Sequence, residues 1–426
     1  MKKFVFLVAA VFALSCSAAE FDSDSRKAIA EEVGSPESVG ISSDRISRLE
    51  AYMQRQVDEQ RVGGLQILVA RHGKIVFHKG AGMLDADAGI AVGKDSIFGL
   101  NSMTKPVTSV AVLMLYEQGH YLLTDPVSKY LPELADLQVY VSGEGDDIVT
   151  RPAAREMTIQ DLLRHTSGVT YGFMGHPEVS AYYREHEVGS YKEDSATFIT
   201  KLSKAPLVAD PGSKWEYSQS TSVLARLVEV VSGQRFDEYL RQHLFEPLGM
   251  VDTGFYVTEA DMDRLSARFE QQPDGTLKQY DKRTDRYAAE PIFISGGSGL
   301  VSTTGDYFRF AQMLLNGGEF EGARILSPIT VNYMTKNQIP KNTERNFMTP
   351  PWQGFGLGVS VVMDNVAVGS VGSVGSYSWA GTASCNFWVD PVEDLVVIIL
   401  TQIYPTRAFQ LRAEVEPLVY QAIIGD

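Results

Sequence analysis

Two residues near position 100 have the types and the spacing of a nucleophile and its base. Ser102 and Lys105 lie in the stretch FGLNSMTK, where an extended segment runs directly into an apolar helix. Residues three apart on a helix share a face, so the Ser102 hydroxyl and the Lys105 amine are expected to lie together. An amine kept neutral by burial can take the hydroxyl proton. About one Ser-x-x-Lys match arises at random in a chain of this composition, so a polar cap on a core helix is the alternative.

Two later segments supply further candidates. Tyr217 lies in PGSKWEYSQ, between a turn and a helix, where its hydroxyl could pass a proton to a leaving group. A lone tyrosine of this kind is more often an interfacial residue with one hydrogen bond. Gly381 beside Thr382 allows the close backbone approach that an edge strand needs to offer an amide to a substrate oxygen. A β-bulge explains this glycine equally well.

The elements that must position these residues follow from hydrophobic periodicity. A first helix is predicted after an N-cap at Ser43, with Gly63-Gly64 as its stop. Two β-rich runs around a turn at 71–74 predict a hairpin. Thr158 and Asp161 form a capping box at the start of a later helix.

The order of elements predicts an α+β fold of the β-lactamase/transpeptidase-like kind, in which helices flank one antiparallel sheet. Strands are expected again in FISGGSGLVST, GFGLGVSVV, ASCNFWVD and DLVVIILTQIY, before a terminal amphipathic helix. The sheet domain is therefore assigned to residues 43–120 and 291–426. Residues 121–290, which favour helices and long loops, form an inserted helical domain.

The first residues are typical of an export signal. A basic start, an apolar run and a small-residue site after Ala19 predict a signal peptide over residues 1–19, followed by a tail over 20–42. A periplasmic or secreted protein is expected, and lipid attachment at Cys16 is an alternative. Cleavage would leave Cys385 as the remaining cysteine, so no internal disulfide is expected.

The composition argues against several classes of protein. The chain has 426 residues and a formal charge of −15, which becomes more negative when Lys2 and Lys3 are removed. An acidic exported chain is a poor candidate for binding nucleic acid or anionic lipid. The sequence has no HExxH, paired-cysteine, Walker or GxGxxG motif, so neither a metal nor a nucleotide cofactor is expected. It also has no GxSxG elbow, which disfavours an α/β-hydrolase.

Together, the three segments resemble the serine β-lactamase and penicillin-binding-peptidase superfamily, and within it the class C β-lactamases and the family VIII carboxylesterases. The similarity spans roughly residues 40 to 424 and includes LLRHTSG, PGSKWEYS and SGGSGLVSTTGDYFRFAQMLLNGG. This resemblance implies that Ser102 is the acylated nucleophile and that Lys105 and Tyr217 transfer the proton. It also implies an oxyanion hole formed by the backbone amides of Ser102 and Thr382.

Two positions depart from the β-lactamase pattern. Trp379 stands where β-lactamases and DD-peptidases carry a lysine that binds the substrate's carboxylate, and losing that contact costs anionic substrates about 1.5–3 kcal/mol. Trp379 also offers apolar area to a neutral acyl or alcohol group. Gln219 stands where β-lactamases carry an asparagine. Gln219, Trp379 and Gly381 are expected to contact the substrate, and the resemblance implies hydrolysis of short-chain carboxylic esters.

Two other functions stay open at this point. One is a class C-type β-lactamase or DD-peptidase, and the other is a non-catalytic penicillin-binding-like protein. A small-molecule ester is the expected partner, with no nucleic acid and no obligatory protein partner. His165, in RHTSG, is expected to be a structural hydrogen-bonding residue of the pocket wall and not a catalytic base.

Overall fold

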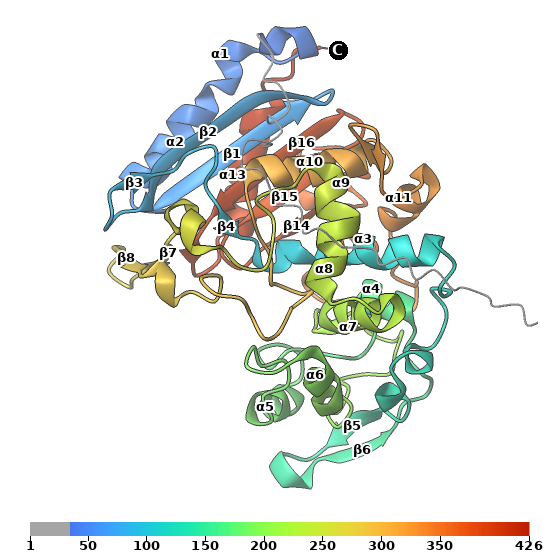
Figure 1. Cartoon of the computed structure of the whole chain (residues 1–426). Helices are drawn as coiled ribbons and strands as arrows, with labels where there is room; N and C mark the ends of the chain where they lie inside the picture. The colour runs from blue at the N-terminus through green and yellow to red at the C-terminus, as the bar shows by residue number, and fades with distance from the viewer. Residues whose placement is uncertain (1–34, 426) are drawn as a thin grey trace, which may run out of the picture.

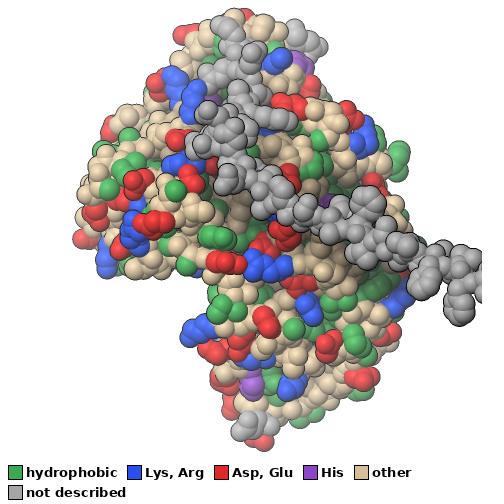
Figure 2. Space-filling view, viewed as in Figure 1, with side chains coloured by type: hydrophobic (Ala, Val, Ile, Leu, Met, Phe, Trp, Pro, Cys, Tyr) green, Lys and Arg blue, Asp and Glu red, His purple; other side chains and the backbone are tan. Residues whose placement is uncertain are grey.

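A computed structural model describes residues 35–425 of the chain (Figure 1). The predicted signal peptide, with Cys16 inside it, lies outside these residues. No helix within the described range has both the length and the apolar composition needed to cross a bilayer. On the face shown in Figure 2, acidic and basic side chains are interspersed.

The central element is an eight-stranded sheet with the order β12-β13-β14-β15-β16-β1-β2-β3. Its strands are β1 (Gly64–Arg71), β2 (Lys74–Asp85), β3 (Ile90–Ala91), β12 (Gln353–Phe355), β13 (Ser360–Val362), β14 (Tyr377–Ala380), β15 (Asn386–Asp390) and β16 (Leu395–Thr401). All neighbouring strands are antiparallel, and Leu65 of β1 lies opposite Thr401 of β16. One antiparallel sheet is thus built from both ends of the chain, as the sequence predicts.

Each face of the sheet buries its own set of side chains, because successive residues of a strand point to opposite sides. One face packs Ile67, Val69 and Trp388 under helices from the two ends of the chain. These helices are α1 (Ser43–Ile46), α2 (Arg48–Asp58) and α13 (Ala408–Tyr420). The opposite face packs Leu68 and Phe387 under α3 (Thr104–Glu117) and α10 (Thr304–Leu315). The nucleophile segment is therefore on the α3 side of the sheet.

The middle of the chain carries most of the shorter helices. They are α4 (Ile159–Leu163), α5 (Pro177–Glu185), α6 (Ser195–Leu202), α7 (Ser220–Ser232), α8 (Phe236–Leu240) and α9 (Glu246–Leu248), followed later by α11 (Pro328–Met334) and α12 (Asn365–Val368). In Figure 1, α7 and α8 lie beside α3, and α5 and α6 lie farthest from the sheet. The assignment of 121–290 to a separate domain stays a prediction.

Several small strands complete the fold. β5 (Gln138–Ser142) pairs with β6 (Val149–Pro152), β7 (Arg268–Gln271) pairs with β8 (Leu277–Tyr280) and with β17 (Ile403–Tyr404), β4 (Phe98–Gly99) pairs with β9 (Val301–Ser302), and β10 (Glu319–Phe320) pairs with β11 (Ala323–Arg324). The region between residues 121 and 290 is thus not purely helical.

Local boundaries agree with the sequence in some places and differ in others. The capping box of Thr158 and Asp161 is confirmed. The first helix is capped by Ser42, whose side chain accepts from the Arg45 amide, so the prediction of Ser43 as the cap was wrong. This helical region also ends at Asp58, before the predicted glycine stop, because Gln60 has a positive φ of 52° that turns the chain.

The stretch FISGGSGLVST contains only two strand residues, Val301 and Ser302. The glycines before them form a loop pressed against α7: a Cβ on Gly296 would lie 2.7 Å from the Thr221 carbonyl oxygen. The prediction of a longer strand was wrong because these glycines serve close packing instead of sheet pairing. The expected strand at Tyr217 is also missing, and one bridge, between Lys214 and Glu344, pairs the chain there.

Candidate active site

The Ser102 hydroxyl and the Lys105 amine lie together at the start of α3. A 3-10 turn, Asn101–Met103, precedes the helix, so Ser102 and Lys105 are one turn apart. The Lys105 Nζ is 3.4 Å from the Ser102 Oγ. It also donates to the Gly297 carbonyl oxygen at 2.7 Å and to the Tyr171 hydroxyl at 3.0 Å. The amine is therefore held by neutral acceptors beside the serine.

The surroundings of Lys105 favour its neutral form. Its side chain is fully buried, whereas Ser102 keeps a small exposed fraction of 8%. Burial, together with the positive charge of Arg286, holds the pKa of Lys105 well below its ordinary value. Within residues 35–425 no carboxylate lies within ion-pair distance of the amine. Lys105 can thus accept a proton at moderate pH.

Tyr217 packs over this amine. The Lys105 Nζ lies 4.6 Å from the centre of the Tyr217 ring. Burial raises the pKa of Tyr217, and the neighbouring Ser102 and Trp379 offset a part of that rise. Among the described residues, however, neither the Tyr217 hydroxyl nor the Trp379 indole nitrogen has a hydrogen-bond partner of normal geometry. Unpartnered buried polar groups cost about 1–3 kcal/mol each, so their presence beside Ser102 points to atoms that a bound substrate would satisfy.

The Tyr217 segment is held by the turn that follows α4. The Glu216 amide donates to the His165 carbonyl oxygen at 2.8 Å, and the His165 Nδ1 is 3.1 Å from the Ser218 Oγ. The His165 ring lies 5.0 Å from that of Tyr217. Burial holds the pKa of His165 well below its ordinary value, so the ring is neutral. His165 therefore positions the tyrosine, and its hydrogen bond goes to Ser218 and not to Ser102.

The end of β14 packs directly against the nucleophile turn. A Cβ on Gly381 would lie 2.3 Å from the Leu100 carbonyl oxygen, so only glycine permits this approach. Thr382 follows as an exposed residue, and in the described part of the chain no backbone carbonyl accepts from its amide. Trp379, two residues earlier, places its ring 5.4 Å from that of Tyr217. The three segments singled out from the sequence thus converge on one place.

Gln219 reaches the same place indirectly. Its side-chain oxygen accepts from the Ser222 hydroxyl at 3.2 Å. A Cβ on Gly297 would lie 3.2 Å from the Ser222 Oγ and 3.5 Å from the Lys105 Nζ, so Ser222 lies close to the amine. The structure therefore brings Gln219 to the edge of the cluster through Ser222.

The comparison with known protein families supports this geometry. Residues 49–421 match the family described as Beta-lactamase. The chain belongs to the beta-lactamase family. It is therefore a member of a family of serine hydrolases, and the predicted superfamily and fold class are confirmed.

Three relatives show how far the likeness extends. Protein Rv1367c of Mycobacterium tuberculosis (strain ATCC 25618 / H37Rv) is 32% identical over 373 residues, which cover 86% of this chain and 92% of that protein. Esterase EstB of Burkholderia gladioli is 29% identical over 373 residues, covering 83% of this chain and 90% of the esterase. The solved structure of EstCE1, described as a hydrolase with promiscuous acyltransferase activity, has a TM-score of 0.74 at 24% identity, covering 90% of this chain and 99% of that one.

Three contributors to this beta-lactamase-family site were missed from the sequence. Tyr171 and the Gly297 carbonyl both accept from Lys105. Arg286 donates to the Asn101 Oδ1 at 3.0 Å, the Tyr287 hydroxyl at 2.6 Å and the Ser298 carbonyl oxygen at 2.7 Å. Tyr171 follows the RHTSG segment and Gly297 lies within SGGSG, so both belong to stretches that the resemblance already includes. Arg286 had no comparable signal.

Proposed function

We propose that the protein hydrolyses esters of short carboxylic acids through an acyl-enzyme intermediate on Ser102. The observation that carries the proposal is the buried Lys105 amine, which contacts Ser102, lies under Tyr217 and has no carboxylate partner in the described chain. The name of EstB as an esterase and the description of EstCE1 as a hydrolase support the same reaction class.

The proposed reaction has two halves. The Ser102 oxygen attacks the ester carbonyl while Lys105 and Tyr217 accept its proton, and the amides of Ser102 and Thr382 stabilise the oxyanion. The carbon–oxygen bond to the alcohol then breaks, and Tyr217 protonates the departing alkoxide. Water next attacks the acyl-Ser102 ester, with the same pair as base, and releases the acid.

The preference for esters over β-lactams is proposed from Trp379. This indole is 8% exposed and packs against Tyr217 and Phe355, so it presents an apolar surface where a lysine would bind an anion. We expect Trp379→Lys to raise the kcat/KM for a chromogenic cephalosporin, relative to that for p-nitrophenyl butyrate, by about 10- to 150-fold. The added ammonium group gives the cephalosporin carboxylate a charge-assisted hydrogen bond. Parallel steady-state assays on both substrates measure this ratio.

The control for this change is Trp379→Phe, which keeps an apolar ring and adds no charge. Its ratio of the two kcat/KM values should stay near that of the wild type. A folded Trp379→Lys protein with an unchanged ratio would contradict the assignment of Trp379 as the residue that selects neutral substrates. Efficient cephalosporin hydrolysis by the wild type, with little ester hydrolysis, would favour the β-lactamase alternative.

The electrostatics of Lys105 predict how activity depends on pH. A protonated amine cannot accept the Ser102 proton, so kcat/KM is expected to fall as the pH falls through the pKa of Lys105. Arg286 lowers that pKa by repulsion. Arg286→Met should therefore raise the pKa of Lys105 and move the acidic limb of the kcat/KM profile to higher pH. Initial rates of ethyl butyrate hydrolysis in a pH-stat measure the limb.

Arg286→Lys is the matched variant for this test because it keeps the positive charge. Its acidic limb should stay closer to that of the wild type than the limb of Arg286→Met. An acidic limb at the same pH in all three proteins would show that Arg286 does not act on Lys105.

A further inference from the structure

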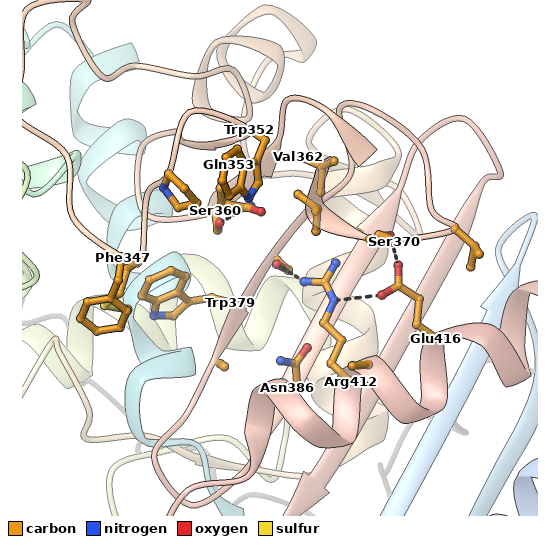
Figure 3. Close-up of a pocket in the computed structure, with 18 of the residues that line it drawn as sticks. Phe347, Trp352, Gln353, Ser360, Val362, Ser370, Trp379, Asn386, Arg412 and Glu416 are labelled. Atoms are coloured by element: carbon orange, nitrogen blue, oxygen red, sulfur yellow. Dashed lines mark hydrogen bonds and ion pairs between the residues drawn. The ribbon is translucent and has the colours of Figure 1, made fainter. Parts of the chain in front are cut away.

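A second space lies on the other side of β14 from the Ser102 cluster. It is a cavity of about 500 Å³ between β14 and the helix α13, a volume typical of small-molecule sites (Figure 3). One end is apolar and includes Phe347, Trp352 and Trp379, and the other end is polar and includes Asn386, Arg412 and Glu416. The cavity therefore has two chemically different ends.

The apolar end borders the proposed active site. Trp379 lines the cavity and also packs its ring 5.4 Å from that of Tyr217. Phe347 follows directly after Asn346, whose side-chain nitrogen is 3.4 Å from the Trp215 carbonyl oxygen. The loop that forms this end thus runs beside the segment that carries Tyr217.

The polar end contains a buried amide without a partner. Asn386 is 2% exposed, and its side-chain oxygen has no hydrogen-bond partner among the described residues. In Figure 3, the Asn386 and Arg412 side chains lie next to each other at the cavity. Buried amides in folded proteins are nearly always hydrogen-bonded, so an unpaired one at a cavity wall points to a missing ligand.

The charges at this end balance. The Arg412 guanidinium donates to the Ser378 hydroxyl, and its Nε lies 3.9 Å from the Glu416 Oε2. Glu416 in turn accepts from the Ser370 hydroxyl. An anionic ligand would meet the Glu416 carboxylate, so the cavity fits an uncharged one. Because arginine has five N–H donors and these contacts engage only part of them, Arg412 can still donate to an acceptor oxygen.

We propose that this cavity receives the alcohol portion of the ester, and that this portion is an uncharged ring system carrying a carbonyl oxygen that binds Asn386 and Arg412. The inference rests on the proposed function. Tyr217 protonates the leaving alkoxide there, and Trp379, which contacts Tyr217, forms the near wall of the cavity. The acyl group can be short while the alcohol is large.

Two butyrate esters of similar size test the polar contact. The 4-methylumbelliferyl ester has a two-ring alcohol with a carbonyl oxygen, and the 1-naphthyl ester has a two-ring alcohol without one. Asn386→Leu removes the amide at similar volume. We expect it to lower the kcat/KM of the umbelliferyl ester about tenfold more than that of the naphthyl ester, the effect of one hydrogen bond. An equal change in both esters would overturn the assignment of Asn386.

A filling variant tests the location. Val371 lines the cavity and is 62% exposed, while Val366, on α12, is 86% exposed and does not line it. Val371→Trp should lower the kcat/KM of both two-ring esters relative to that of ethyl butyrate, and Val366→Trp should leave these ratios near those of the wild type. Equal ratios in the two tryptophan variants would overturn the location.

Equilibrium dialysis of free 4-methylumbelliferone separates this inference from the proposed function. The Ser102→Ala protein should bind the alcohol, and adding Asn386→Leu should weaken binding about tenfold, again the effect of one hydrogen bond. Undetectable binding, or equal binding by both proteins, would overturn the inference even if the wild type hydrolyses esters. Binding that depends on Asn386 in a protein that hydrolyses no ester would instead overturn the proposed function and leave the cavity as a ligand site.

Discussion

Replacing Ser102 by alanine is expected to reduce the kcat/KM for p-nitrophenyl butyrate by about 10⁴- to 10⁶-fold, because no acyl-enzyme can form. The side chain is small and sits at the start of α3, so its hydroxyl can be removed without opening a large cavity. Steady-state kinetics on the purified protein measure the loss, and thermal unfolding followed by circular dichroism checks the fold.

Ser109, on the same helix and also buried, provides the matched control. Ser109→Ala should keep ester hydrolysis within a few-fold of the wild type. A fluorophosphonate probe should label the wild type and Ser109→Ala at Ser102, and should not label Ser102→Ala. A folded Ser102→Ala protein with wild-type activity would rule out Ser102 as the nucleophile and with it the whole mechanism.

Replacing Lys105 by methionine is expected to lower kcat/KM by about 10²- to 10⁴-fold, the usual contribution of a positioned acid–base group. Methionine fills similar space on α3 but cannot accept the Ser102 proton. Fluorophosphonate labelling of Ser102 should slow along with ester hydrolysis, because both reactions require an activated hydroxyl. Steady-state kinetics and the rate of labelling measure the two effects.

A second buried lysine distinguishes loss of a base from loss of a buried amine. Lys282 is 6% exposed and lies 3.1 Å from the Asp85 carboxylate, away from Ser102 along the β7–β8 side of the fold. Lys282→Met should lower the unfolding temperature, since it leaves Asp85 without its cation, and should change kcat/KM little. Equal losses of kcat/KM in the two folded variants would contradict the role given to Lys105.

The residues that could be predicted from the sequence are those whose meaning is local. Ser102 and Lys105 share one helical turn, so their contact follows from spacing alone. Gly381 announces a close backbone approach, and the structure supplies the Leu100 carbonyl that requires it. The alternating strands near the C-terminus and the hairpin after the first helix were enough to predict an antiparallel sheet built from both chain ends.

The residues that could not be predicted act through loops whose paths depend on distant packing. Tyr171 and Gly297 accept from Lys105, but nothing in their own neighbourhoods shows which amine they will meet. The apolar and β-branched residues of the Gly297 segment resemble a strand, and only its fit against α7 shows why it is a loop. The cavity beside β14 needs α13 as a wall, a contact between elements far apart in the chain.

The position of β1 between β2 and β16 has a consequence for the synthesis of the chain. The hairpin of β1 and β2 leaves the ribosome early, but its second neighbour, which brings Thr401 opposite Leu65, is made near the end. Until then one edge of β1 has open amides and carbonyls that invite aggregation. Ser102 also waits for Trp379 and Thr382, so the nascent polypeptide needs protection and cannot assemble its active site before its last strands are translated.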